Sequence, residues 1–81
     1  MARVSFPDHL LTHTDGVREL EVHASSYRDL VAALETRFPG ISDVLLKKVS
    51  VAIDGEIIHS PFLEEIDANS EVFFMARIEG G

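Results

Sequence analysis

The chain has 81 residues, with 14 acidic and 7 basic side chains, a formal net charge of −7, and neither cysteine nor tryptophan. A chain this short forms one domain without a deep catalytic cleft, and it has no disulfide, cysteine-based zinc site or cysteine nucleophile. The acidic balance argues against a nucleic-acid partner, because phosphate binders cluster Lys and Arg. With no signal peptide and no apolar run of ~20 residues, we expect a cytoplasmic protein without a membrane partner.

The first quarter of the chain predicts a β-hairpin. Apolar and polar residues alternate at 3–7 and again at 19–23, and the pair Asp15-Gly16 lies between them. Alternation is the period of a half-buried strand, and Asp-Gly is a turn signal.

A helix is predicted to begin after Ser26 and to end near Phe38. Apolar residues recur there at steps of three and four, so they line one helix face: Tyr27, Leu30, Val31, Leu34 and Phe38. Ser26 is a favourable N-cap, and Pro39-Gly40 ends the element. Residues 41–48 are expected to be a connector with a single helical turn around 43–46.

The remaining chain predicts a second hairpin and one more strand. Alternation returns over 49–53, the turn signal Asp54-Gly55 follows, and Ile57-Ile58 begins the return strand. Three apolar side chains are expected to anchor the loop after it: Phe62, Leu63 and Ile66. A polar turn at 67–70 then leads into the most apolar strand, 71–78.

These elements predict an α+β fold of the β-grasp type, with a mixed sheet of about five strands packed on one main helix. One amphipathic helix covers only one face of a sheet. The last strand is expected in the centre of the sheet, parallel to the first. We assign residues 1–78 to the β-grasp domain and 79–81 to a flexible C-terminal diglycine tail.

The last strand also predicts an exposed apolar surface. Alternate residues are expected to face the helix: Val72, Phe74, Ala76 and Ile78. Phe73, Met75 and Arg77 then lie on the opposite face, which a chain this short has no second layer to cover. Pro7 and Ile57 would extend the same surface. Contiguous exposed apolar area is typical of a partner site. In the alternative interpretation, the loop 39–48 after the helix, which includes the connector, shields this face.

The sequence ends in Gly80-Gly81, directly after the predicted central strand. Glycine lacks a Cβ atom, so such a tail can thread a narrow channel. It would present the α-carboxylate of Gly81, which becomes electrophilic only after activation, for example as an acyl adenylate. The chain has no glycine-rich phosphate-binding motif for a nucleotide, so we predict that it is not itself an enzyme.

Four segments together resemble the ubiquitin-like sulfur carriers of the MoaD/ThiS type, which include the small subunit of molybdopterin synthase and the thiamine-pathway sulfur carrier. The segments are 37–40 (RFPG), 51–56 (VAIDGE), 66–74 (IDANSEVFF) and Gly80-Gly81. The molybdopterin-type tail often has Phe at the position of Met75 and prolines at those of Ala76 and Arg77.

The resemblance implies that an ATP-dependent, ubiquitin-activating-like enzyme adenylates Gly81, and that this terminus becomes a thiocarboxylate. The sulfur would then pass to a sulfur-accepting synthase subunit in cofactor biosynthesis. A molybdopterin-type pathway is favoured, with thiamine, cysteine or another sulfur-transfer pathway as alternatives. Gly80 would give access to Gly81. ATP belongs to the partner, and no cofactor is expected on this chain.

Partner contacts are predicted on the outer face and the tail, at Ile57, Phe73, Met75, Arg77, Ile78 and Glu79. By the resemblance, Met75 and Ile57 occupy apolar docking positions. The alternative function is a β-grasp interaction module or protein modifier, whose tail is inert or becomes amide-linked to lysines.

Metal binding and acid-base catalysis are not predicted. The histidines lack ligand-like spacing: His9, His13, His23 and His59. The acidic run at Glu64, Glu65 and Asp67 is expected to be solvated. Together with Glu71 and Glu79, it would steer the chain toward a basic activating enzyme.

Overall fold

The computed structural model describes residues 1–47, 49–59 and 64–77. In these residues the elements are β1 (Ala2–Ser5), a 3-10 helix (Asp8–Leu10), β2 (Glu19–Val22), α1 (Tyr27–Arg37), α2 (Ile41–Lys47), β3 (Val49–Ile53), β4 (Glu56–Ile58) and β5 (Glu71–Ala76). None of the helices in this described part of the chain is long and apolar enough to span a membrane.

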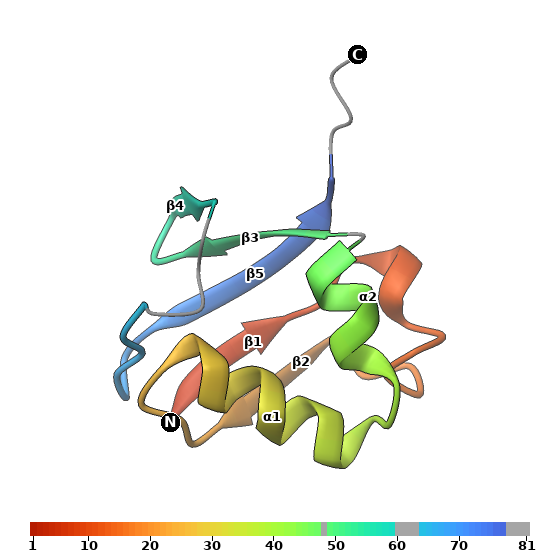
Figure 1. Ribbon diagram of the computed structural model, residues 1–81, viewed down its shortest axis with the longest axis horizontal. Helices are drawn as coiled ribbons and strands as arrows, with labels where there is room; N and C mark the ends of the chain where they lie inside the picture. The colour runs from red at the N-terminus through yellow and green to blue at the C-terminus, as the bar shows by residue number, and fades with distance from the viewer. Residues whose placement is uncertain (48, 60–63, 78–81) are drawn as a thin grey trace.

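The strands form one mixed sheet in the order β2-β1-β5-β3-β4 (Figure 1). β5 lies in the centre, parallel to β1 and antiparallel to β3. The outer pairs, β1–β2 and β3–β4, are antiparallel. The predicted β-grasp fold, with the last strand central and parallel to the first, is therefore confirmed.

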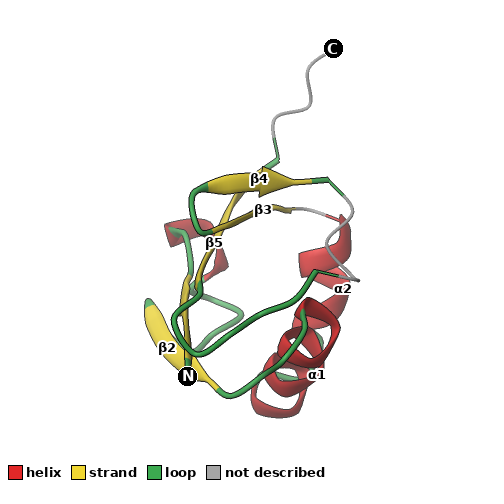
Figure 2. Cartoon of the chain, turned by 90° about the vertical axis from the view of Figure 1, so that its left-hand side faces the viewer, coloured by secondary structure: helices red, strands yellow, loops and turns green. Residues whose placement is uncertain are grey.

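Both α-helices lie on one side of the sheet, and within the described residues no α-helix covers the other side (Figure 2). α1 begins where the sequence predicts, because the Ser26 Oγ accepts a hydrogen bond from the Asp29 N–H at 3.1 Å. Its predicted apolar stripe is buried. The helix ends before Gly40, whose φ of +95° is a conformation that glycine adopts without steric cost.

α2 is longer than the single turn expected around 43–46, since it spans 7 residues. A carboxylate from α1 stabilises its start: Glu35 accepts hydrogen bonds from the Gly40 N–H at 2.7 Å and the Ser42 N–H at 2.9 Å. These bonds favour the ionised carboxylate and so lower the pKa of Glu35. Ile41 and Leu45 of α2 are buried in the core. The connector therefore packs on the inner side, and the interpretation in which it shields the outer face is wrong.

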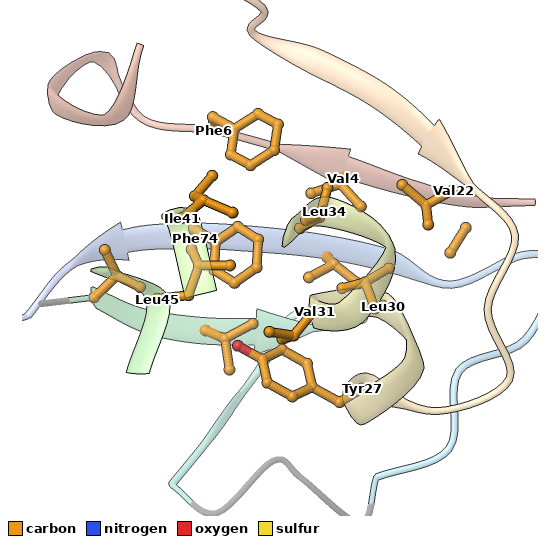
Figure 3. Close-up of a cluster of buried hydrophobic side chains, with 14 of the residues drawn as sticks. Val4, Phe6, Val22, Tyr27, Leu30, Val31, Leu34, Ile41, Leu45 and Phe74 are labelled. Atoms are coloured by element: carbon orange, nitrogen blue, oxygen red, sulfur yellow. The ribbon is translucent and has the colours of Figure 1, made fainter. Parts of the chain in front are cut away.

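The hydrophobic core fills the space between the helices and the inner face of the sheet (Figure 3). Phe74 of β5 stacks on Phe6 with ring centroids 5.8 Å apart, and its centroid lies 6.4 Å from that of Tyr27. Phe38 contacts Phe6 edge-on at 6.2 Å. Stacked and edge-on pairs are favoured aromatic arrangements. Burial in this core raises the pKa of the Tyr27 hydroxyl to about 12.

The connection between β1 and β2 is more structured than the tight hairpin turn that the sequence suggests. A 3-10 helix follows β1 and buries Leu10. Thr14 is fully buried, and its hydroxyl donates a hydrogen bond to the Val17 carbonyl at 2.8 Å. The predicted turn pair adopts positive φ angles, 54° at Asp15 and 82° at Gly16.

The later turns are as predicted. Asp54 and Gly55, between β3 and β4, have φ angles of 52° and 83°, which suits a hairpin turn. In the turn before β5, the Asp67 carboxylate accepts a hydrogen bond from the Asn69 N–H at 2.8 Å. Of the predicted loop anchors, Ile66 is buried. The other two, Phe62 and Leu63, lie outside the described residues.

Candidate partner-binding face

The outer face of the sheet, opposite the α-helices, divides into an ionic half and an apolar half. In the ionic half, the Arg3 Nε lies 3.2 Å from a Glu19 carboxylate oxygen, and its Nη1 lies 3.9 Å from one of Glu71. All three side chains are more than half exposed, so each pair contributes at most about 1 kcal/mol to stability. The ion pairs mainly keep the β1–β2 half of this face polar.

The apolar half is formed by β3, β4 and β5. The sheet register pairs Ala52 of β3 with Ile57 of β4 on one side and with Phe73 of β5 on the other. Met75 is the next residue of β5 on the same face, because alternate residues of a strand point to the same side. We refer to Ala52, Ile57, Phe73 and Met75 as the outer apolar patch.

Exposure distinguishes the two faces of β5. Phe73 is 44% exposed and Ile57 is 53% exposed, whereas Met75 is half-buried. Val72 and Phe74 point the other way and are buried in the core. The predicted orientation of the strand is confirmed, and it leaves two large apolar side chains facing solvent. Exposed apolar surface with a polar rim is typical of an interaction site.

Sequence reasoning did not identify Ala52 as part of this surface. Ala52 is only 6% exposed, although it does not belong to the core cluster. Its burial is explained by the larger side chains of Ile57 and Phe73 on either side. Alternation with the core residues Val51 and Ile53 was the available signal, since it places Ala52 on the outer face.

The end of β5 differs from expectation at one position. Ala76 was expected to face the helix, yet it is exposed. It is the last residue of β5, and it pairs with Val49, the first residue of β3, at the end of the sheet. Arg77 follows directly and is exposed. Pro7 is half-buried beyond the end of β1, so it borders the face rather than forming part of the sheet.

Ile78, at the end of the predicted last strand, and the tail residues Glu79, Gly80 and Gly81 lie outside the described residues. Their predicted roles stay predictions, as do the partner contacts at the described positions of the face.

The acidic residues expected to be solvated are exposed: Glu64, Glu65, Asp67 and Glu71. Two of them have structural roles, because Asp67 stabilises a turn and Glu71 pairs with Arg3. The segment that carries them leads into the beginning of β5, at the end of the sheet opposite the C-terminus of that strand (Figure 1). This acidic segment therefore lies at the end of β5 opposite its C-terminus.

The histidines are dispersed over the surface. All four are exposed: His9, His13, His23 and His59. Over residues 1–47, 49–59 and 64–77, no three side chains of the metal-ligating types gather into a group that could hold an ion. The structure instead brings together the features of a recognition face.

Solved structures share this fold over the whole chain. A chain of the Amycolatopsis orientalis BexX/CysO complex is 25% identical, with a TM-score of 0.85 and coverage of 100% of both chains. CysO from Mycobacterium tuberculosis, described as an antigen, is 19% identical, with a TM-score of 0.86 and coverage of 96% of this chain and 100% of that one. A putative molybdopterin converting factor subunit 1 from Pyrococcus furiosus is 16% identical, with a TM-score of 0.73 and coverage of 95% and 97%.

Sequence comparison identifies the family. None of the curated proteins matches the chain. The model of the ThiS family matches residues 4–81, which is nearly the whole sequence. Members of this family are small carriers on which activating enzymes act, and they are not enzymes themselves. With the β-grasp fold and the family match in agreement, the chain belongs to the ThiS family of ubiquitin-like sulfur carriers.

Proposed function

We propose that this chain carries sulfur as a thiocarboxylate on Gly81. In the first step, a carboxylate oxygen of Gly81 attacks the α-phosphorus of ATP on an activating enzyme, forming an acyl adenylate and releasing pyrophosphate. In the second step, sulfide attacks the acyl carbon, and AMP leaves. The thiocarboxylate then gives its sulfur to an acceptor bound by a synthase subunit. Membership of the ThiS family supports this sequence of steps.

The observation that carries the proposal is the position of the outer apolar patch on the strand that precedes the tail. β5 is hydrogen-bonded to β1 on one side and to β3 on the other, so it is a rigid base for the residues that follow. A partner that covers Phe73 and Met75 would be held beside the start of the tail. Fully burying one such side chain contributes about 1.5–3 kcal/mol.

A related solved structure supports action through a protein partner. The chain is 25% identical to a chain in the BexX/CysO complex, over the full length of both. By analogy, we propose that the outer face first binds the activating enzyme and later the sulfur-accepting subunit. A precursor of the molybdopterin type is the proposed acceptor, and acceptors of the thiamine and cysteine pathways are the alternatives.

The decisive experiment measures the intact mass of the full chain after incubation with the adenylating enzyme of the same organism, ATP and sulfide. We expect a mass gain equal to the replacement of one oxygen atom by one sulfur atom. The gain should require ATP, and exchange of labelled pyrophosphate into ATP should report the first step by itself. Each acceptor is then added in turn, and loss of the gained mass identifies the pathway.

Two results would contradict the proposal. Covalent adducts with lysines of other proteins, without the sulfur-containing form, would support the protein-modifier function instead. An unchanged mass, with an adenylating enzyme shown to be active on another carrier of the family, would exclude the thiocarboxylate mechanism.

A further inference from the structure

Charge is ordered along the outer face of β5. By alternation, the outward residues of β5 are Glu71, Phe73 and Met75, and Arg77, which directly follows the strand, is exposed. A carboxylate therefore lies at the start of the strand, apolar side chains lie in the middle, and a guanidinium group lies at the end. Asp54 adds a second carboxylate at the start, because it accepts a hydrogen bond from the Glu71 N–H at 2.8 Å.

A second cation lies at the end where β5 stops. Val49 begins β3 and pairs with Ala76 of β5, and Lys47 is the last residue of α2, shortly before Val49. The Lys47 side chain is 71% exposed, and its Nζ lies 3.2 Å from an Asp43 carboxylate oxygen. An ion pair this exposed is weakened by solvent screening, so Lys47 can still interact with a partner.

The cations on the ionic half of the outer face and beside it each have a carboxylate partner. Arg3 pairs with two glutamates, and the Arg18 Nη1 lies 2.6 Å from an Asp8 carboxylate oxygen. Arg77, by contrast, makes no ion pair with any residue that the structure describes. On a chain with a formal net charge of −7, the end of β5 is thus a local positive site.

We infer that the activating enzyme presents carboxylates where its apolar binding surface receives the end of β5, opposite Arg77 and Lys47. At the other rim of that surface, basic side chains would face Glu71 and Asp54. This inference rests on the proposed carrier function, because it names the chemistry of the partner that the function requires.

The ordered charges would fix the direction in which β5 lies across the partner. Phe73 and Met75 are both long apolar side chains, so apolar contact alone distinguishes poorly between the two directions along the strand. Opposite charges at the two ends do distinguish them, because the reversed orientation would place like charges together. Correct direction matters here, since only one orientation brings the tail to the nucleotide.

Association kinetics with the adenylating enzyme of the same organism test this inference. The variant is Arg77→Glu, and the matched control is Arg28→Glu, an equal change of charge at an exposed position of α1, on the opposite layer. We expect Arg77→Glu to slow association roughly tenfold at low salt, and Arg28→Glu to have a much smaller effect. The difference in association rate between the two variants should shrink near 1 M salt, where the Debye length is about 3 Å. Lys47→Glu should act in the same direction as Arg77→Glu.

Equal slowing by Arg77→Glu and Arg28→Glu would show that only net charge matters, and would overturn the inference. Faster association of Arg77→Glu would overturn it too, since the partner would then be basic at this end. Neither result bears on the carrier function, which the mass gain of the unmodified chain tests separately. Failure of the carrier function would instead abolish the mass gain of the unmodified chain. Thermal melting of each variant confirms that it is folded.

Discussion

Phe73 and Phe74 are consecutive residues of β5 that point to opposite faces of the sheet. Phe74 is 3% exposed and lies in the aromatic core, whereas Phe73 is 44% exposed on the outer face. Both are phenylalanines of the same strand, but one packs in the core and the other faces solvent. They therefore form a matched pair for separating stability from recognition.

Replacing each of them by alanine should give opposite results. Phe74→Ala should destabilise the fold by about 3–5 kcal/mol, as expected for a large core side chain. Phe73→Ala should change stability by only about 0.5 kcal/mol. It should nevertheless weaken binding to the activating enzyme by tenfold or more (about 1.4 kcal/mol), because exposed aromatic residues often dominate interfaces. Denaturant titration and calorimetric binding measure the two effects. Similar destabilisation by both variants would show that the assigned strand orientation is wrong.

Acid should weaken the junction between α1 and α2 through Glu35. Its folded-state pKa lies below the ordinary value of 4.5, because the carboxylate accepts hydrogen bonds from the Gly40 and Ser42 backbones. A lowered pKa means that this stabilisation is present above pH 4.5 and is lost as the pH falls through the folded-state pKa. Glu35→Gln should therefore lower the melting temperature at neutral pH and make less difference in acid.

The control for this prediction is Glu21→Gln, at an exposed position of β2. It should not change the melting temperature in the same pH-dependent way. If Glu35→Gln and the unmodified chain differ by the same amount at neutral and acid pH, ionisation of Glu35 does not stabilise the junction.

Alkali should act on the core through Tyr27. Burial raises its pKa from 10.0 to about 12, so the stabilisation is fully present below pH 10 and is lost as the pH rises through 12. The loss should be on the order of 3 kcal/mol, and Tyr27→Phe should not show it. Tyr27 is the only tyrosine of a chain without tryptophan, so tyrosinate absorbance follows this one group. Ionisation of the folded chain at the ordinary pKa would contradict the prediction.

The tail should tolerate no change of length. Deleting Gly81 would shorten its reach by about 3.5 Å, the span of one extended residue. Adding a residue after Gly81 would offer ATP a different and bulkier group. Both changes should abolish adenylation, measured by pyrophosphate exchange, and should leave the melting curve unchanged because terminal residues contribute little to the fold. An extended chain that stays fully active, with its extra residue confirmed by mass, would argue against the carrier function.

Local signals in the sequence were sufficient for the elements that local interactions stabilise. Ser26 caps α1 from the adjacent position, and the alternation of Val49, Val51 and Ile53 reports a strand with one buried face. The exposure of Phe73 also followed from local alternation, once one helix layer was assigned to the sheet. These parts of the fold and the face could be predicted without knowing any long-range contact.

The parts that were missed depend on contacts between distant residues. The length of α2 depends on Glu35, which binds the Ser42 N–H from 7 positions earlier. The burial of Ala52 depends on side chains from two other strands, Ile57 and Phe73. Ala76 is exposed as the last residue of β5, and alternation alone does not mark where a strand ends. None of these relationships leaves a periodic pattern in the sequence, so pattern analysis could not find them.

The central position of β5 has a consequence for protein synthesis. In the described sheet, the β1–β2 and β3–β4 hairpins are joined only through Glu71–Ala76. A nascent chain therefore cannot close its core until residues 71–76 have been made. Because the tail follows the same strand, a prematurely terminated chain would lack both the tail and the fold. Such a product would be removed by proteases and would not compete with intact carriers for the activating enzyme.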